Sequence, residues 1–432
     1  METDPGTAPT QNPAPAPGEP GRRALVIGAG IGGLTAAAGL ADRGWDVTVL
    51  ERSASLEPVG AAISLAPNGQ RALDRVGVGD AVRELAAWQG AGGLRAPDGR
   101  WLARTSSEEA GERYGDSLVL LHRATLIGLL RARLAEDVVR VDAAAEVVDP
   151  GAADDPRRPA RVRTAAGELT ADLVVAADGI GSATRRHLFP GHPGPVYAGF
   201  TTWRLVVPAP ADPFPPHETW GRGALWGSHL LHDGTVYAYA AAATPEGGHA
   251  PDGERAELLR RFGDWHHPVP ALLAAAEPDG VLRHDVRHMR QPLPAFHRGR
   301  VALLGDAAHA MAPSLGQGGN QAIEDGVVLA HHLAPGTPPG PGLAAYSADR
   351  LPRTSAVVAR AAKAGALTTL RPAVAVRLRD ALVATVSRLG PDLVLRSFAG
   401  ITDWRPPERT YAAPARGARP EGRRGRDAGS GT

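Results

Sequence analysis

The stretch Ala24–Gly33 reads ALVIGAGIGG, an apolar run that passes straight into glycines. An Ala/Leu-rich segment follows, so the pattern predicts a strand, a tight turn and a helix in that order. Gly44 is suited to ending this helix, and Asp46–Leu50 supplies a second apolar run. Together these residues predict a βαβ unit. The N-terminal region is therefore expected to begin a doubly wound α/β sheet.

The glycines fit the pattern G-x-G-x-x-G between the expected strand and helix. Gly28 allows the tight turn, Gly30 lets the backbone approach a pyrophosphate, and Gly33 lets the helix pack close to the strand. Glu51 follows 18 residues after Gly33, where its carboxylate can accept hydrogen bonds from ribose hydroxyls and disfavours a 2′-phosphate. Arg52 is a further candidate for cofactor binding. The alternative is a glycine-rich turn without a ligand, in a chain that has 53 glycines.

A later strand and turn help to separate a flavin from a nicotinamide dinucleotide. Val301–Leu304 is apolar and ends in Gly305-Asp306, which places a carboxylate within reach of a polyol chain. A glycine-rich loop then leads to a helix that we expect to begin near Gln321. Exposed N–H groups at that helix start would stabilise the negative charge of a reduced flavin. The pattern favours FAD, with loop candidates Gly316, Gly318, Gly319 and Asn320.

Two more segments are candidates for contact with the same cofactor. Leu173–Ala176 predicts a strand and is followed by Asp178-Gly179, which can line the pyrophosphate region. Arg123, ahead of a Leu-rich helix, can contact phosphate or the ribityl chain. No second strand-linked G-x-G-x-x-G is apparent, so a separate nicotinamide domain is not expected.

These residues, in this order and at this spacing, resemble the class A flavoprotein monooxygenases. That family has the fold of p-hydroxybenzoate hydroxylase and includes enzymes similar to salicylate hydroxylase and 3-hydroxybenzoate 6-hydroxylase. The resemblance covers residues 22–396. It implies non-covalent FAD, transient NADPH or NADH, and O2 as the source of one oxygen atom. That atom is inserted into an aromatic or conjugated substrate through a flavin C4a-hydroperoxide, as a hydroxylation or an epoxidation.

The resemblance also implies roles for single residues. Asp306 would bind the ribityl chain, Asp178 would touch both FAD and the nicotinamide cofactor, and Arg123 would contact FAD. A further group would stabilise a helical region rather than take part in the chemistry: Tyr346, Arg350 and Arg353.

The expected fold is α/β, with a Rossmann-type FAD-binding domain, an inserted antiparallel β-sheet substrate domain and C-terminal helices. Alternating or aromatic runs at Val196–Val207 and Ala224–Ala243 predict the antiparallel strands, and Pro352, Pro372 and Pro391 are expected to break the C-terminal helices. The predicted division is a disordered leader at 1–21, FAD-binding segments at 22–70, 105–185 and 286–362, substrate-domain segments at 71–104 and 186–285, helices at 363–403 and a disordered tail at 404–432.

Composition excludes several classes of protein. There is no cysteine, so disulfides, thiolate metal sites and iron–sulfur clusters are excluded. The 47 basic and 46 acidic side chains nearly balance, so nothing in the charge favours nucleic acid or a membrane surface as a partner. The first residues lack the apolar stretch of a signal peptide, so a cytoplasmic protein is expected. We also expect either a monomer or a homodimer. The expected partner is a small aromatic or polycyclic substrate.

The substrate side is less defined by the sequence. Arg204 can bind a carboxylate or phenolate of the substrate, although a surface salt bridge is the competing interpretation. His309 and Pro313 lie between two cofactor motifs and are expected near the isoalloxazine, with a packing role for His309 as the alternative. Aromatic residues of the inserted domain form either a flat-ring pocket or ordinary core: Trp203, Trp220, Trp226, Tyr237 and Tyr239. Candidate histidines for assisting phenol deprotonation are His229, His232, His284 and His288.

Two other functions remain open from the sequence alone. One is an oxygen-independent FAD reductase of the same superfamily, which would favour a long lipid-like channel. The other is an FAD-binding module that has lost catalysis and serves as a redox sensor.

Overall fold

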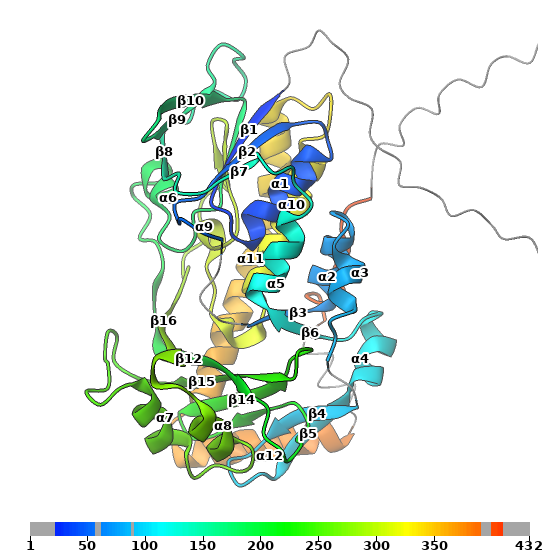
Figure 1. The fold of residues 1–432 in the computed structure, drawn as a ribbon, viewed down its shortest axis with the longest axis vertical. Coiled ribbons are helices and arrows are strands. Elements are labelled where there is room, and N and C mark those ends of the chain that lie inside the picture. The colour runs from blue at the N-terminus through cyan, green and yellow to red at the C-terminus, as the bar shows by residue number, and fades with distance from the viewer. Residues whose placement is uncertain (1–21, 57–61, 88–89, 390–398, 409–432) are drawn as a thin grey trace, which may run out of the picture.

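The computed structural model describes residues 22–56, 62–87, 90–389 and 399–408. Figure 1 shows two parts, each built around a β-sheet, with one long helix running from the first part to the second. The expected leader at 1–21, the break at Pro391 and tail residues 409–432 lie outside the described residues.

A six-stranded sheet forms the first part. Its strands are parallel except for the first pair. The runs predicted from sequence form the centre of the sheet, because strands covered on both faces need continuous apolar residues. The predictions of parallel strands at residues 24–27, 46–50, 173–176 and 301–304 are confirmed. In order across the sheet, the strands are β17 (His297–Arg298), β18 (Val301–Leu303), β11 (Leu173–Ala176), β1 (Arg23–Ile27), β2 (Asp46–Leu50) and β7 (Val139–Arg140).

Two helices pack closely against each other beside this sheet. Helix α1 (Ile31–Ala41) follows the glycine turn, and α10 (Gly318–His332) follows the second glycine loop. A Cβ at Gly326 would lie 2.7 Å from the backbone N of Ala36, and one at Gly39 would lie 2.9 Å from Cβ of Ala330. The glycines therefore permit close contact between the two helices. Helix α10 begins three residues before the start expected from sequence, so the glycines of the loop form its first turn.

A seven-stranded sheet forms the second part. All neighbours are antiparallel except β13 and β4, which are parallel. The expected antiparallel pairing of 196–207 with 224–243 is confirmed. In order across the sheet, the strands are β16 (Leu282–His288), β12 (Val196–Pro208), β15 (Thr235–Ala242), β14 (Ala224–Leu230), β13 (His217–Trp220), β4 (Ala91–Arg95) and β5 (Trp101–Ser106).

The two faces of this sheet have different roles. One face packs against α7 (Glu254–Phe262) and α8 (Val269–Ala275). Trp203 and Trp226 belong to that core, with 2% and 0% of their surface exposed. The alternate residues of the same strands lie on the opposite face, which we call the inner face. It packs toward the loop before α10.

The remaining elements complete the two parts. Residues 71–83, predicted as part of the substrate domain, lie mostly in α2 (Pro67–Asp74) and α3 (Gly79–Arg83). Their buried side chains join the core of the first part. Only β4 and β5 of that segment join the second sheet. The small sheets are β8 (Ala145–Asp149), β9 (Ala160–Thr164) and β10 (Gly167–Ala171), and β3 (Ala62–Leu65) with β6 (Val119–His122). Further helices are α2 (Pro67–Asp74), α3 (Gly79–Arg83), α4 (Ser107–Tyr114), α5 (Arg123–Arg131), α6 (Ala183–Leu188), α9 (Asp306–His309) and α12 (Ala373–Leu389), and short 3₁₀ turns are η1 (Pro278–Gly280) and η2 (Pro313–Leu315).

The prediction that Pro352 breaks a helix is wrong. Helix α11 (Pro339–Thr368) continues through Pro352, whose side chain is exposed. An interior proline costs about 3 kcal/mol because it removes a hydrogen bond. Here the opposite face of α11 buries Tyr346 and Arg350 completely, and their contacts hold the helix in one piece. The break before Pro372 is confirmed, since α11 ends at Thr368 and α12 begins at Ala373.

The expected start of a disordered tail at residue 404 is also wrong. Trp404 packs against the core of the first part. Its ring lies 5.4 Å from the guanidinium of Arg353, and its backbone oxygen accepts a hydrogen bond from Arg71 over 3.0 Å. Sequence composition missed this contact because a single anchoring aromatic does not change the polar average of a segment.

Candidate active site

The first glycine turn has the geometry expected of it. Gly28 has a φ of +102°, and a Cβ there would lie 2.5 Å from the oxygen of Ala177. A Cβ at Gly33 would lie 2.0 Å from the oxygen of Gly28, so the helix can approach the strand only with glycine. Gly30 faces open space, with no atom within 4 Å of the Cβ position. An open backbone surface at the start of α1 is what a phosphate group needs.

Glu51 supports this turn from the end of β2. Its Oε2 accepts a hydrogen bond from the backbone N of Ala29 over 2.8 Å, and its Oε1 accepts one from Ser53 over 2.9 Å. Each carboxylate oxygen has a second acceptor position, so the half-buried side chain can still receive ribose hydroxyls. Arg52 is exposed beside it.

Charged side chains from three distant segments gather past the turn. Burial lowers the pKa of the Arg123 guanidinium, Asp306 opposes this effect and Arg204 adds to it. Arg123 nevertheless keeps exposed surface, as does Asp306. The structure thus brings together Arg123, Asp306 and Arg204, which are far apart in the sequence.

Asp178 has a buried oxygen without a protein partner. Its Oδ2 accepts a hydrogen bond from the backbone N of Thr184 over 3.1 Å, while Oδ1 is buried and has none among the described residues. Burial lowers the pKa of neighbouring Arg185, and Asp178 opposes that shift. Buried oxygens without a hydrogen-bond partner are rare in proteins, so this position fits a polar cofactor that donates a hydrogen bond to Oδ1. Gly179 has a φ of +75° and faces open space.

The second glycine loop presents a helix start. Gly305 and Gly316 have positive φ angles of 59° and 61°, and Gly318 and Gly319 form the first turn of α10. First-turn N–H groups have no partner within their helix and attract negative charge. Asn320 is fully buried, and its amide bonds the backbone of Ser64, Ala66 and Gly316. Its side chain therefore holds the loop, and contact with a cofactor is left to its backbone.

His309 belongs to a buried network of charged side chains. Its Nε2 lies 2.6 Å from Oδ2 of Asp325, and the same oxygen accepts from the backbone N of Gly305 over 2.8 Å. Arg350 donates to Oδ1 of Asp325 and to Oε2 of Glu324, each over 2.6 Å. Burial raises the pKa of Asp325, but His309 and Arg350 outweigh burial and lower it to about 2. The network fixes the turn that carries Asp306.

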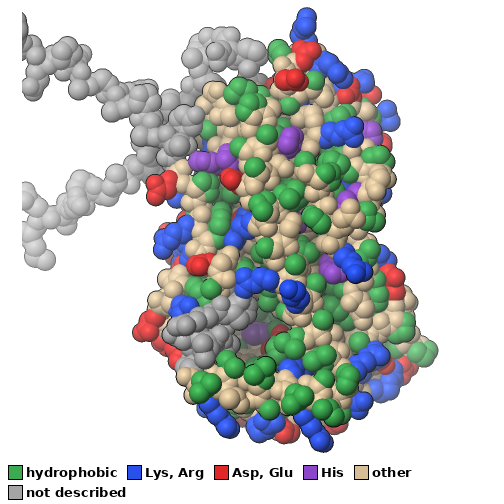
Figure 2. Space-filling model, turned by 180° about the vertical axis from the view of Figure 1, so that it is seen from behind, with side chains coloured by type: hydrophobic (Ala, Val, Ile, Leu, Met, Phe, Trp, Pro, Cys, Tyr) green, Lys and Arg blue, Asp and Glu red, His purple; other side chains and the backbone are tan. Residues whose placement is uncertain are grey.

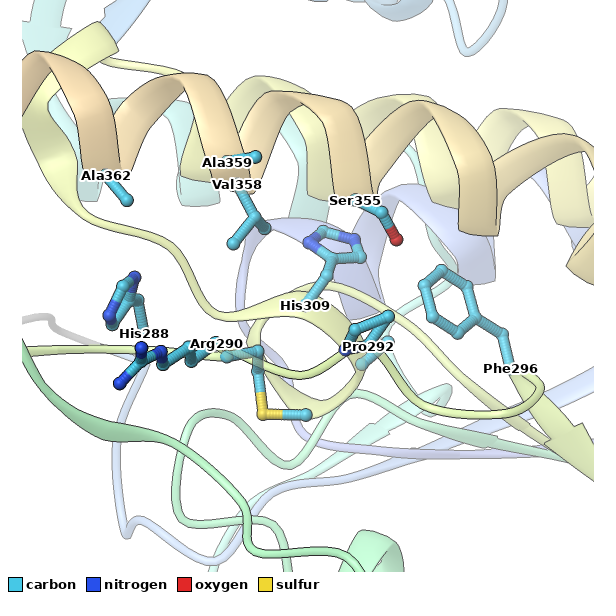
Figure 3. Close-up of a pocket in the computed structure, with 11 residues that line it drawn as sticks. His288, Arg290, Pro292, Phe296, His309, Ser355, Val358, Ala359 and Ala362 are labelled. Carbon is cyan, nitrogen blue, oxygen red and sulfur yellow. The ribbon is translucent and has the colours of Figure 1, made fainter.

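The ring of His309 lines a cavity of about 270 Å³ between α11 and the segment after β16. Figure 3 shows His309 beside Ser355 and Pro292, with His288 and Arg290 farther along the same cavity. Neither Arg204 nor Pro313 lines it. His309 lies in α9, off the seven-stranded sheet, whereas His288 ends β16 two residues after Val286, which belongs to the inner-face cluster.

The inner face of the seven-stranded sheet carries polar and aromatic side chains. Arg204 lies opposite Tyr239 in the pairing of β12 with β15, and it also acts on the pKa of Tyr237. No hydrogen bond or ion pair of Arg204 is present within the described ranges, so the surface salt bridge considered from sequence is absent there. Figure 2 shows a hollow in one face where the two parts meet, with basic side chains above it and apolar side chains below.

This face also packs against the loop that precedes α10. Phe200, Leu225 and Ala241 share one apolar cluster with Ala312, and Leu315 packs against it. Pro313 lies between these last two residues and is exposed. The loop around Pro313 therefore packs against the inner face of the sheet.

Of the four candidate histidines, strand alternation puts three on the inner face: His229 on β14, and His284 and His288 on β16. Burial lowers the pKa of His229 to about 4, so its imidazole is neutral near pH 7. Burial and then Arg204 lower the pKa of His284, which keeps exposed surface. His232 is exposed at the turn between β14 and β15.

Sequence reasoning missed Glu218, which lies on β13 at the inner face. Its carboxyl accepts hydrogen bonds from Nε1 of Trp220 and, over 2.7 Å, from the hydroxyl of Tyr239. The only signal in the sequence was one acidic residue inside the aromatic segment that ends at Trp220. That signal does not say which neighbours the carboxyl meets.

Among the described residues, no group of three or more His, Asp or Glu side chains is placed to hold a metal ion. In the same part of the chain, no helix is both long and apolar enough to cross a membrane.

Comparison with known families agrees with this geometry. A family model described as an FAD binding domain matches residues 22–361. The chain belongs to this family, within the class A FAD-dependent aromatic monooxygenases.

Individual relatives narrow the class. The aurachin C monooxygenase/isomerase of Stigmatella aurantiaca is 35% identical over 370 residues, which are 85% of this chain and 95% of the relative. The 3-amino-4-hydroxybenzoate 2-monooxygenase of Streptomyces cremeus is 36% identical over 354 residues, 78% of this chain and 86% of the relative. The structure of Klebsiella pneumoniae HpxO complexed with FAD and uric acid has a TM-score of 0.77 at 29% identity, covering 87% of this chain and 97% of that one.

The chain is therefore an FAD-dependent monooxygenase that uses O2, with NAD(P)H as the cosubstrate typical of the family. The relatives support oxygenation of a small aromatic molecule. They do not support the oxygen-independent reductase or the inactive binding module considered from the sequence.

Proposed function

We propose that this monooxygenase oxygenates an aromatic ring held between the inner face of the seven-stranded sheet and the loop around Pro313. The observation that carries the proposal is the shared apolar cluster of Phe200, Leu225 and Ala241 with Ala312. It joins the substrate side to the loop that begins the flavin-facing helix α10. Relatives that act on aminohydroxybenzoate and urate support a substrate of one or two rings.

The FAD site in this proposal uses the residues selected from sequence. Bound FAD, once reduced, supplies the activation of O2 and the transfer of one oxygen atom. The glycine turn and Asp178 would hold the pyrophosphate, Asp306 and Arg123 would bind the ribityl chain, and the N–H groups at the start of α10 would stabilise negative charge on the flavin. The complete set is Gly28, Gly30, Gly33, Glu51, Arg52, Arg123, Asp178, Gly179, Gly305, Asp306, Gly316, Gly318, Gly319 and the backbone of Asn320.

The protein contributes binding and the exclusion of water. The apolar cluster covers the reacting region, since water must be kept from reactive oxygen species formed there. Arg204 binds an acidic group of the substrate, and Pro313 shapes the wall next to the flavin. We assign His309 a positioning role, because its bond to Asp325 holds the Gly305-Asp306 turn. A cytoplasmic location, a monomer or homodimer, and a choice between NADH and NADPH stay predictions.

Flavin content and oxygen uptake test this function. Asp306→Leu is expected to lose most of its bound flavin, because an apolar side chain replaces the acceptor for ribityl hydroxyls. Asp279→Leu, which changes an exposed carboxylate on the second part, is the matched control and should remain yellow. With native enzyme, an aromatic substrate should accelerate NAD(P)H oxidation and O2 consumption with little peroxide. Full flavin occupancy in Asp306→Leu would contradict the assigned site.

A further inference from the structure

One row of residues crosses three neighbouring strands on the inner face. Glu218 on β13 pairs with Gly227 on β14, and Gly227 pairs with Tyr239 on β15. A Cβ at Gly227 would lie 2.2 Å from Cζ of Tyr239, so the tyrosine ring lies directly over the glycine. Because Gly227 has no side chain, Tyr239 reaches across it and donates its hydroxyl to Oε2 of Glu218 over 2.7 Å.

Glu218 is a hydrogen-bond acceptor without a cation. Trp220 donates to Oε1 and Tyr239 to Oε2, and within the described ranges this carboxyl forms no ion pair. Each carboxylate oxygen can accept a second hydrogen bond. Burial raises the pKa of Glu218, opposed by Trp220 and Tyr239, yet the side chain keeps accessible surface. A partly exposed carboxyl with free acceptor positions can take another donor.

Among the described residues, no cation is a cause of the pKa shift of this carboxyl, and the guanidinium of Arg379, 5.4 Å from the Trp220 ring, is paired with Asp380. His229 stacks on Tyr239 with ring centroids 5.8 Å apart and planes 9° apart, and its low pKa keeps the imidazole neutral. Trp220 and Tyr239 pack against the apolar cluster that includes Ala312. The acceptor therefore faces the space assigned to the substrate, in surroundings that strengthen a hydrogen bond.

The same row ends in a cation on its other side. Arg204 on β12 pairs with Tyr239, three strands away from Glu218. Neighbouring strands lie about 4.8 Å apart, so the two backbones are separated by roughly 14 Å. An aromatic ring with substituents at both ends fits between an acceptor and a cation at that separation.

We propose that Glu218 and Tyr239 form a subsite that holds a phenol O–H or an arylamine N–H of the substrate and rejects a ring carboxylate at this position. The proposal rests on the proposed function and adds the polarity of the substrate to it. A carboxylate at Glu218 would bring two anions together, whereas a donor completes the hydrogen bonds of the acceptor. An acidic group of the substrate is directed toward Arg204.

Two ring compounds provide the probe, one with O–H and N–H donors and one in which methyl groups replace all three donor hydrogens. 2-Aminophenol and 2-methoxy-N,N-dimethylaniline would be titrated into the purified holoenzyme, followed by the shift of the flavin spectrum and by calorimetry. The native protein is expected to bind 2-aminophenol at least about tenfold more tightly, the size of one hydrogen bond to a charged group. Glu218→Gln turns an amide donor toward the ligand, and Tyr239→Phe removes the bridging hydroxyl. Each should reduce the preference to less than about threefold.

Glu277→Gln is the matched control, because Glu277 is an exposed carboxylate on the second part of the molecule, and it should keep the native preference. The subsite is overturned if both variants retain FAD and the native preference, or if the native holoenzyme binds the two compounds equally or binds neither. A native protein that holds no FAD, or whose NAD(P)H oxidation responds to no aromatic compound, contradicts the proposed function instead.

Discussion

Replacing Arg350 with methionine tests the buried charge network behind the cofactor site. The guanidinium is 1% exposed and lies between the carboxylates of Glu324 and Asp325, each 0% exposed and each 2.6 Å away. It also donates to the side chain of Gln321 over 2.9 Å. Methionine fills similar volume and restores none of these contacts.

The expected loss follows from what remains after the change. Removing one partner of a buried pair costs about 3–5 kcal/mol, since the other charge stays buried. Arg353 still donates to Glu324, and His309 still bonds Asp325. The loss in unfolding free energy should therefore lie near the lower end, about 3 kcal/mol. That is a large part of the 5–15 kcal/mol typical of a folded domain.

Urea unfolding of the holoenzyme, followed by tryptophan fluorescence and by flavin release, measures this loss. Arg353→Met is the matched control. Its side chain is 16% exposed and Glu324 keeps Arg350 as a partner, so the loss should be smaller, about 1–2 kcal/mol. An Arg350→Met loss below about 1 kcal/mol, or one no larger than that of Arg353→Met, would refute the reasoning.

Three further changes give independent checks. Gly33→Ala should abolish flavin binding or folding, because the new Cβ would lie 2.0 Å from the oxygen of Gly28; a yellow, folded variant would contradict the close approach. His217 is buried, and burial lowers the pKa of its imidazole to about 3. In the unfolded chain the same imidazole takes up a proton near its ordinary pKa of about 6.5. The free energy of unfolding therefore falls as the pH drops below that value. Between pH 7 and 5 this group alone should remove about 2 kcal/mol, and His217→Gln should flatten that part of the urea-unfolding profile; an equally steep profile would count against it. Gly227→Ala should lower the free energy of unfolding by about 1–3 kcal/mol through overpacking against Tyr239, and a variant as stable as the native enzyme would show that the ring moves freely.

The sequence predicted those parts of the fold that depend on local pattern. The run Ala24–Gly33 combines an apolar strand with glycines whose steric need is local, and the structure has that strand, turn and helix. The helix through Pro352 was missed, because its continuation depends on tertiary contacts of Tyr346 and Arg350.

The sequence predicted the site residues that belong to a recognisable motif. It did not predict those whose contacts depend on the register between strands. Asp306 was selected from its Gly-Asp turn and Arg123 from its place ahead of a Leu-rich helix, and the structure brings them together. The bond between Tyr239 and Glu218 depends on the register of three strands and on a glycine between them. No spacing in one sequence reveals that register. The carboxyl that accepts the hydrogen bond from Tyr239 could therefore be found only in the three-dimensional structure.

The order of strands in the six-stranded sheet bears on how the protein is made. Strand β1 pairs with β2 at once, but its other neighbour, β11, follows about 120 residues later. At about 5–20 residues per second, a ribosome needs roughly 6–25 s to deliver it. During that interval a nascent chain exposes an unpaired, apolar strand edge that invites aggregation. Chaperone co-expression should therefore raise the yield of recombinant enzyme more than changes to its surface.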